Sequence, residues 1–185
     1  MRQAVHSNRS SAAASLVPRC GPASASTRAR LRGADPRLRV ERPRVKFLLD
    51  TAPWINGVTL PETIPPRIRR LLDVSERKGL CRVSLLEAAI LHRLGRLKFE
   101  GTLPDLFAAG LSEDVELLDL TAAIAARTNE LPDDFSGDPF DRTIIATAAV
   151  LDLTLVTTDP AIRDAGVCAV EYYPFKANRP SKRRR

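Results

Sequence analysis

The sequence predicts an α/β fold in which helices cover a parallel sheet. From Val45 to Tyr172, short apolar runs alternate with longer amphipathic runs, and this alternation is typical of βαβ units. Two of the short runs, residues 45–50 and 154–159, each end in an aspartate. The carboxyl ends of parallel strands share one edge of a sheet with the amino ends of the following helices. These acids should therefore meet at the edge where ligands bind.

The first half of this pattern begins with a strand that starts at Val45. Residues 57–66 are rich in proline and are expected to be mostly loop. A helix is expected over 67–78, followed by a short strand over 81–83. The next helix, over 85–97, carries leucine and isoleucine at helical spacing, which predicts the apolar face Leu86, Ile90, Leu94 and Leu97.

The second half repeats the alternation. A short helix is expected over 103–111, a strand over 115–118, and a helix that Thr121 caps and that reaches about residue 130. The helix over 139–151 is the most apolar, so we expect it against the centre of the sheet. A strand over 154–158, a helical turn after Pro160 and a last strand over 168–172 complete the pattern.

Charge divides the chain into three parts. Of the net charge of +7, residues 1–44 carry +8 and residues 176–185 carry +6, which leaves −7 on residues 45–175. We expect a disordered basic extension over 1–44, one folded domain over 45–175 and a basic tail over 176–185. An organelle transit peptide would share the composition of the extension, and the abrupt start of the folded pattern favours translation from near Val45. The basic ends suit a solvated arm and a nucleic-acid contact equally.

Several classes of protein are excluded. Cys20, Cys81 and Cys168 form no CxxC pair, and the two histidines stand at no zinc-ligand interval, so neither a disulfide framework nor a zinc site is expected. No apolar stretch approaches the ~20 residues that cross a bilayer, which predicts a cytoplasmic protein with no membrane contact. There is no glycine-rich phosphate loop or G-x-S-x-G elbow. A haloacid-dehalogenase-type phosphatase would need an acid where Ala52 stands.

Five acids are the candidate site residues, and four of them also have ordinary explanations at helix starts. Ser84-x-x-Glu87 has the form of a capping box, Asp138 and Asp159 each precede a proline as N-caps do, and Asp141 falls in a first turn. Asp50 follows Leu48 and Leu49 with no helix-start signature. Asp50 therefore favours a cluster of carboxylates at the sheet edge.

Such a cluster requires a cation. Two carboxylates about 4 Å apart repel by roughly 4 kcal/mol at an effective dielectric constant of 20. Ligands that are all oxygen favour Mg²⁺ or Mn²⁺. A bound ion of this kind can polarise a phosphodiester, orient water for attack and neutralise the leaving oxygen, so hydrolysis of a nucleic-acid backbone is the predicted chemistry.

Four motifs carry a resemblance to a known family. They are Phe47-Leu48-Leu49-Asp50-Thr51, Ser84-Leu85-Leu86-Glu87-Ala88-Ala89-Ile90, Gly137-Asp138-Pro139-Phe140-Asp141-Arg142 and Leu155-Val156-Thr157-Thr158-Asp159-Pro160. In this order, over roughly residues 45–173, they resemble PIN-domain ribonucleases and more narrowly the VapC-type toxins of toxin–antitoxin modules.

The resemblance implies a three-layer α/β/α sandwich around a mostly parallel sheet of four to five strands. It implies a Mg²⁺-dependent endoribonuclease that acts on RNA, forms a homodimer and is inhibited by a cognate antitoxin. Asp50, Glu87, Asp141 and Asp159 match the catalytic and metal-binding acids of the family, with Asp138 as a further metal ligand. Thr51 and Thr157 stand where hydroxyl residues support the site, and Arg142 is placed to contact a phosphate or to pair with a nearby acid.

Two alternatives stay open. The chain could be a PIN-like nuclease that processes RNA or cuts DNA outside a toxin pair. It could also be a non-catalytic module whose basic ends bind nucleic acid while the acids only cap helices.

Overall fold

The computed structural model describes residues 43–132, 135 and 137–175. The expected tail over 176–185 and, apart from Pro43 and Arg44, the expected extension over 1–44 lie outside these residues. Within them the elements follow one another in the order β1 (Phe47–Leu49), α2 (Thr51–Thr59), η2 (Pro61–Thr63), α3 (Pro66–Asp73), β2 (Lys78–Cys81), α4 (Arg82–Arg93), α5 (Leu103–Gly110), β3 (Val115–Leu118), α6 (Ala122–Thr128), α7 (Pro139–Leu151), β4 (Thr154–Thr157), α8 (Pro160–Asp164) and β5 (Val170–Tyr172).

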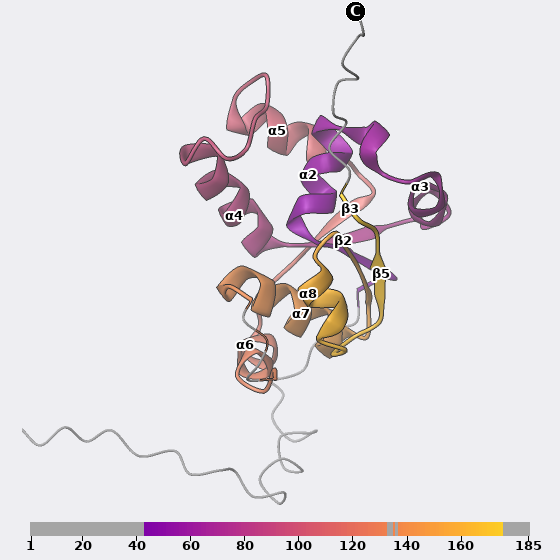
Figure 1. The fold of residues 1–185 in the computed structure, drawn as a ribbon, viewed down its shortest axis with the longest axis vertical. Coiled ribbons are helices and arrows are strands. Elements are labelled where there is room, and N and C mark those ends of the chain that lie inside the picture. The colour runs from indigo at the N-terminus through magenta and orange to yellow at the C-terminus, as the bar shows by residue number, and fades with distance from the viewer. Residues whose placement is uncertain (1–42, 133–134, 136, 176–185) are drawn as a thin grey trace, which may run out of the picture. The chain divides into compact units, whose positions relative to one another are not determined.

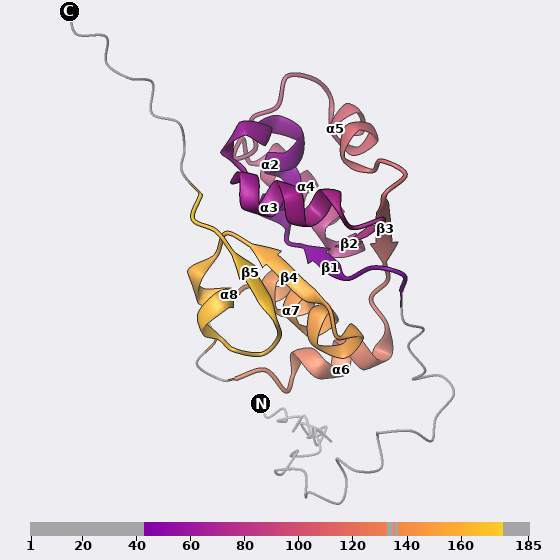
Figure 2. The same cartoon turned by 90° about the vertical axis from the view of Figure 1, so that its right-hand side faces the viewer.

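Figure 1 shows the fold, and its strands form one parallel sheet in the order β3-β2-β1-β4-β5, with all five strands labelled in Figure 2. The central strand β1 pairs with β2 and β4, and Leu49 lies in register with Leu80 on one side and with Val156 on the other. The carboxyl ends of these three strands are therefore level with one another. Side chains that follow them in sequence, such as Asp50, start from the same edge of the sheet.

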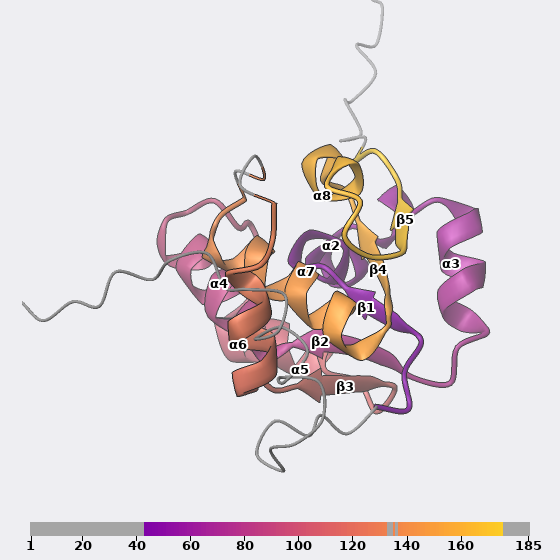
Figure 3. The ribbon, with the colours of Figure 1, turned by 90° about the horizontal axis from the view of Figure 1, so that it is seen from below.

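Helices cover both faces of the sheet. Neighbouring strand residues point to opposite faces, so Leu48 and Leu155 pack with α7, whereas Leu49 and Val156 pack with α2 and α3. Figure 2 shows α2 to α5 on one side of the sheet and α6 and α7 on the other, and in Figure 3 α7 lies across β1 and β4. The expected three-layer α/β/α sandwich with a parallel sheet is confirmed. Within the described ranges, no helix is both long and apolar enough to span a bilayer.

The apolar helix α7 begins and ends where the sequence predicts, and β3 and β4 lie where expected. The second strand was placed too late: it spans Lys78–Cys81, and Val83 already belongs to α4. The preceding helix ends at Asp73 rather than near Lys78. Helix α2 was not predicted, because the prolines around it obscured its pattern, although Pro53 stands in the first turn where proline is tolerated.

Only part of the predicted apolar face of α4 is buried, since Ile90 and Leu97 are half-buried and two of the four residues are exposed. Leu86 and Leu94 are 57% and 55% exposed, whereas the buried residues of this helix are Ser84 and Ala88. Small side chains on the inner face let the helix approach its neighbours closely. The helical spacing of the large residues predicts an inner face, because the sequence shows their spacing and not their burial.

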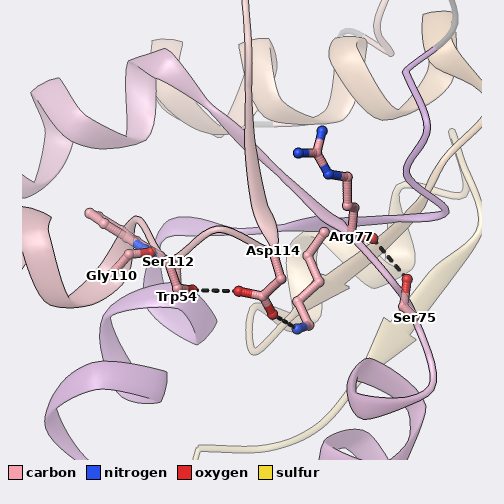
Figure 4. A network of polar contacts seen from close by, with 7 residues as sticks. Trp54, Ser75, Arg77, Gly110, Ser112 and Asp114 are labelled. Atoms are coloured by element: carbon pink, nitrogen blue, oxygen red, sulfur yellow. Dashed lines mark hydrogen bonds and ion pairs between the residues drawn. The ribbon is translucent and has the colours of Figure 1, made fainter.

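A cavity of about 280 Å³ lies between α2, α3 and the sheet, and none of the five acids lines it. Figure 4 shows the polar contacts on one side of it. The Trp54 indole N–H donates to the carbonyl oxygen of Gly110 at 2.8 Å, which fixes α2 against the end of α5. Nearby, Asp114 pairs with Lys78 and accepts a hydrogen bond from the hydroxyl of Ser112.

Candidate active site

Asp50 lies directly after β1 and is only 5% exposed. One carboxylate oxygen accepts from the backbone N–H of Thr51 at 2.7 Å, and the other accepts from the hydroxyl of Thr157 at 2.6 Å. Burial raises the pKa of Asp50 to about 6; the two hydrogen bonds oppose this shift, and the charges of Glu87 and Asp159 add to it. The first of these bonds makes Asp50 the N-cap of α2. The expectation that Asp50 caps no helix is therefore wrong.

Glu87 lies on α4, near enough to Asp50 for its charge to raise the pKa of that carboxyl. Burial raises its pKa, and the charges of Asp141 and Asp138 raise it further, while Arg96 opposes the shift. The Thr51 hydroxyl lies near enough to lower the pKa of Glu87. The two groups do not meet hydrogen-bond geometry, so the Thr51 hydroxyl and one carboxylate oxygen of Glu87 are buried without a partner among the described residues. A buried oxygen without a partner is costly, so this pair indicates a place for a ligand or water.

The start of α7 brings two more acids to the same place. Asp138 is the N-cap and accepts from the backbone N–H groups of Phe140 and Asp141, and Asp141 accepts in return from the backbone of Asp138. The predicted N-cap role of Asp138 and the predicted first-turn position of Asp141 are confirmed, and the two acids together form a capping box. Burial raises the pKa of Asp141 to about 6, helped by the charges of Asp138, Asp50 and Asp159.

Asp159 follows β4, the strand beside β1. It lies two residues beyond the end of β4, and its carboxylate accepts from the backbone N–H of Ala161 at 2.7 Å, which confirms it as the N-cap of α8. Its own backbone N–H donates to the buried hydroxyl of Thr157 at 3.0 Å. Thr157 therefore joins Asp50 to the segment that carries Asp159.

The five acids form one electrostatic cluster. The charges of Glu87, Asp138, Asp141 and Asp159 each act on at least one other acid of the group, and the raised pKa values of Asp50 and Asp141 result partly from this repulsion. Among the described residues, no three acidic, histidine or cysteine side chains already stand close enough to hold a metal ion. The charges of the acids thus act on one another, but among the described residues they form no preassembled ligand shell.

One predicted capping role is wrong, and Arg142 makes contacts that the sequence does not predict. Arg142 donates to the carbonyl oxygens of Phe135 and Thr128 at 3.0 and 2.9 Å, so it joins the loop before α7 to the end of α6. The expected contact of Arg142 with a phosphate or an acid stays a prediction. Ser84 does not form a capping box with Glu87, because α4 already begins at Arg82 and Ser84 lies inside it.

Ser84 is instead a residue of interest that sequence reasoning did not identify. Its side chain is fully buried, and its hydroxyl has no partner within the described part of the chain. It stands one helical turn before Glu87, so the two side chains share a helix face. Ser84 would be a cap if α4 began directly after it, but α4 begins at Arg82. The sequence does not give the position of this helix start.

Comparison with known proteins relates this site to a family. Residues 47–167 match the PIN domain model. Ribonuclease VapC22 of Mycobacterium tuberculosis (strain ATCC 25618 / H37Rv) is 30% identical over 104 residues, which cover 56% of this chain and 78% of that protein.

Solved structures share the fold. VapBC2 from Rickettsia felis, bound to a DNA fragment from its promoter, has a TM-score of 0.54 at 17% identity, over 68% of this chain and 97% of that chain. DNA-bound VapBC from Salmonella typhimurium has a TM-score of 0.54 at 20% identity, over 69% and 98%. With the four motifs and the family match over most of the folded domain, these findings confirm the resemblance: the chain belongs to the PIN-domain family and, within it, to the VapC-type ribonucleases.

Proposed function

We propose that this protein is a Mg²⁺- or Mn²⁺-dependent endoribonuclease and the toxin of a toxin–antitoxin module. The observation that carries the proposal is the convergence of five carboxylates at the carboxyl edge of the sheet, where Asp50 and Asp141 have pKa values raised to about 6. A cation would relieve the repulsion that helps to raise them. The name of the related ribonuclease supports RNA as the substrate.

The residues present fit a hard divalent cation. Asp50, Glu87, Asp141 and Asp159 offer carboxylate oxygens, with Asp138 at the rim, and none of these five candidate ligands is a thiolate or an imidazole. The unpartnered oxygens of Glu87 and Thr51 are consistent with a group that would complete their contacts. When bound, the ion would polarise the phosphodiester and lower the pKa of an attacking water.

The side chains of the chain itself have separable tasks in this proposal. Asp50 is held by the hydrogen bonds from Thr51 and Thr157, so its carboxylate is fixed in orientation before an ion arrives. Glu87 and Asp141 stand on different helices, and both are half-buried, so each can reach an ion and the substrate side of the site. Above pH ~6 the carboxyls of Asp50 and Asp141 are mostly ionised and available as ligands.

A cognate antitoxin and a second copy of the chain are part of the proposal. The structurally similar VapBC proteins were solved as complexes bound to DNA, and this likeness supports an antitoxin partner. The exposed leucines of α4, Leu86 and Leu94, support a protein contact on that helix.

The alternative of a non-catalytic binding module is supported by the capping hydrogen bonds of Asp50, Asp138 and Asp159. Caps do not explain the unpartnered buried oxygen of Glu87. The test is cleavage of an RNA mixture by the purified chain with Mg²⁺, with EDTA, and after Asp50→Asn. We expect cleavage that needs Mg²⁺ and is lost in the variant.

Asp152→Asn is the matched control. Asp152 is an exposed acid at the far end of α7 with a φ of 58°, a conformation that asparagine adopts readily, so this variant should keep full activity. Metal-independent cleavage, or equal cleavage by Asp50→Asn and the parent chain, would refute the proposed function. Cleavage of DNA alone would favour the DNA-cutting alternative.

A further inference from the structure

A basic patch lies at the end of α4 and in the turn after it. Arg93, Arg96 and Lys98 are all exposed, with the exposed His92 beside them. Within the described residues none of the three cations forms an ion pair. This density of unpaired positive charge contrasts with the net −7 of residues 45–175.

The turn after α4 has a defined backbone geometry. Gly95 has a φ of +66° and its N–H donates to the carbonyl of His92, while the N–H of Arg96 reaches back to the carbonyl of Leu91 at 2.9 Å. This is the Schellman arrangement, in which a left-handed glycine ends the helix and reverses the chain. The position of Arg96 is thereby fixed rather than left to a free loop.

The patch begins on the helix that carries Glu87. Arg93 follows Glu87 by six residues on α4, which corresponds to about 9 Å of helix rise, and Arg96 comes directly after the turn that ends the helix. The positive charge of Arg96 lowers the pKa of Glu87, which agrees with this placement.

We propose that this patch, and Arg96 in particular, binds the phosphates of the RNA strand that flank the bond to be cleaved. The inference rests on the proposed function and names the surface by which the substrate is held. A site built from carboxylates repels the phosphate backbone everywhere except where an ion sits, so the strand needs cations at its margin. Arginine suits this task because its planar guanidinium binds phosphate through two parallel hydrogen bonds.

The test separates binding from chemistry. The full chain with Asp50→Asn, which blocks cleavage, is titrated with a fluorescent single-stranded RNA at several salt concentrations. Adding Arg96→Gln should weaken binding several-fold at low salt. It should also reduce the slope of log affinity against log salt by about 0.7, the value for one phosphate contact of a single strand. Arg96→Lys should retain most of the slope.

Arg82→Gln is the matched control, because Arg82 lies on the first turn of the same helix and pairs with Asp119. It should leave affinity and slope unchanged. In the active chain, Arg96→Gln should raise KM with little change in kcat. Equal affinity and slope with and without Arg96→Gln would overturn the inference. The inference would also be overturned if the Arg96→Gln chain bound RNA normally but no longer assembled with a partner protein. If the parent chain neither binds nor cleaves RNA, the proposed function itself fails.

Discussion

The hydroxyl of Thr157 donates a hydrogen bond of 2.6 Å to the carboxylate of Asp50, although the two residues are 107 positions apart in the sequence. The same hydroxyl accepts from the backbone N–H of Asp159 at 3.0 Å. This bridge exists because β1 and β4 are parallel neighbours in register. One buried threonine thus positions both aspartates that end these two runs.

Replacing Thr157 by valine should weaken both the fold and the site. The change removes a hydrogen bond that lowers the pKa of Asp50, so that pKa should rise further above its present value of about 6. The loss of a buried bond to a charged group should cost about 2 kcal/mol of unfolding free energy. Urea unfolding and the pH dependence of RNA cleavage measure the two effects. Thr157→Ser, which keeps the hydroxyl, should resemble the parent, and a valine variant with unchanged stability and pH profile would contradict this role.

Without metal, the carboxyl of Asp50 should destabilise the fold at neutral pH. Its pKa is about 6 in the folded protein and 3.8 in the unfolded chain. Below pH 3.8 it is protonated in both states and costs nothing. Between pH 3.8 and about 6 the unfolded state ionises first, so stability falls, and above pH 6 the full cost of up to about 3 kcal/mol is present. In EDTA, the stability gained by Asp50→Asn should therefore grow from pH 4 to pH 7. A stability difference between Asp50→Asn and the parent chain that does not vary with pH would show that burial does not perturb the pKa of Asp50.

The order of the elements and the acid cluster could be predicted because both follow from local patterns. Alternating apolar runs fix the strands, and an aspartate that ends a strand lies at the sheet edge whatever the loops do. Helix α2 and the true start of α4 could not be predicted. Both depend on where the chain leaves the sheet, and Cys81 and Asp50 act as N-caps only once the strand ends there. The role of Arg142 depends on two carbonyl groups that only the folded loop presents.

Arg142→Gln should reduce stability without affecting RNA binding. The guanidinium joins the carbonyls of Thr128 and Phe135 in a fork that glutamine cannot span, so we expect a loss of about 2 kcal/mol in urea unfolding. RNA affinity per folded molecule should stay the same. Unchanged stability together with a raised KM would instead assign Arg142 to the phosphate contact that its place in the motif first indicated.

Gly110→Ala should disturb the packing of Trp54. A methyl group at this position would lie 2.7 Å from the indole nitrogen, and the ring is buried and hydrogen-bonded to the same residue. We expect a loss of about 1–3 kcal/mol and a shifted tryptophan emission, which is readily assigned because the chain has one tryptophan. Gly57→Ala is the control: its methyl group would meet Ile64 at an ordinary 3.9 Å on a helix, so it should be neutral or stabilising by about 0.5–1 kcal/mol. Equal stability of the two variants would show that Trp54 has room to move.

The central claim is that the acids form one pocket in which a divalent cation relieves their repulsion. Electron paramagnetic resonance of the free ion measures Mn²⁺ binding to the full chain. This measurement tests the claim without any need for activity. We predict that the parent chain and Asp152→Asn bind Mn²⁺ alike, and that Glu87→Gln and Asp141→Asn each weaken binding at least about tenfold because they remove carboxylates that act on the same site. Equal binding by all four proteins would contradict the claim.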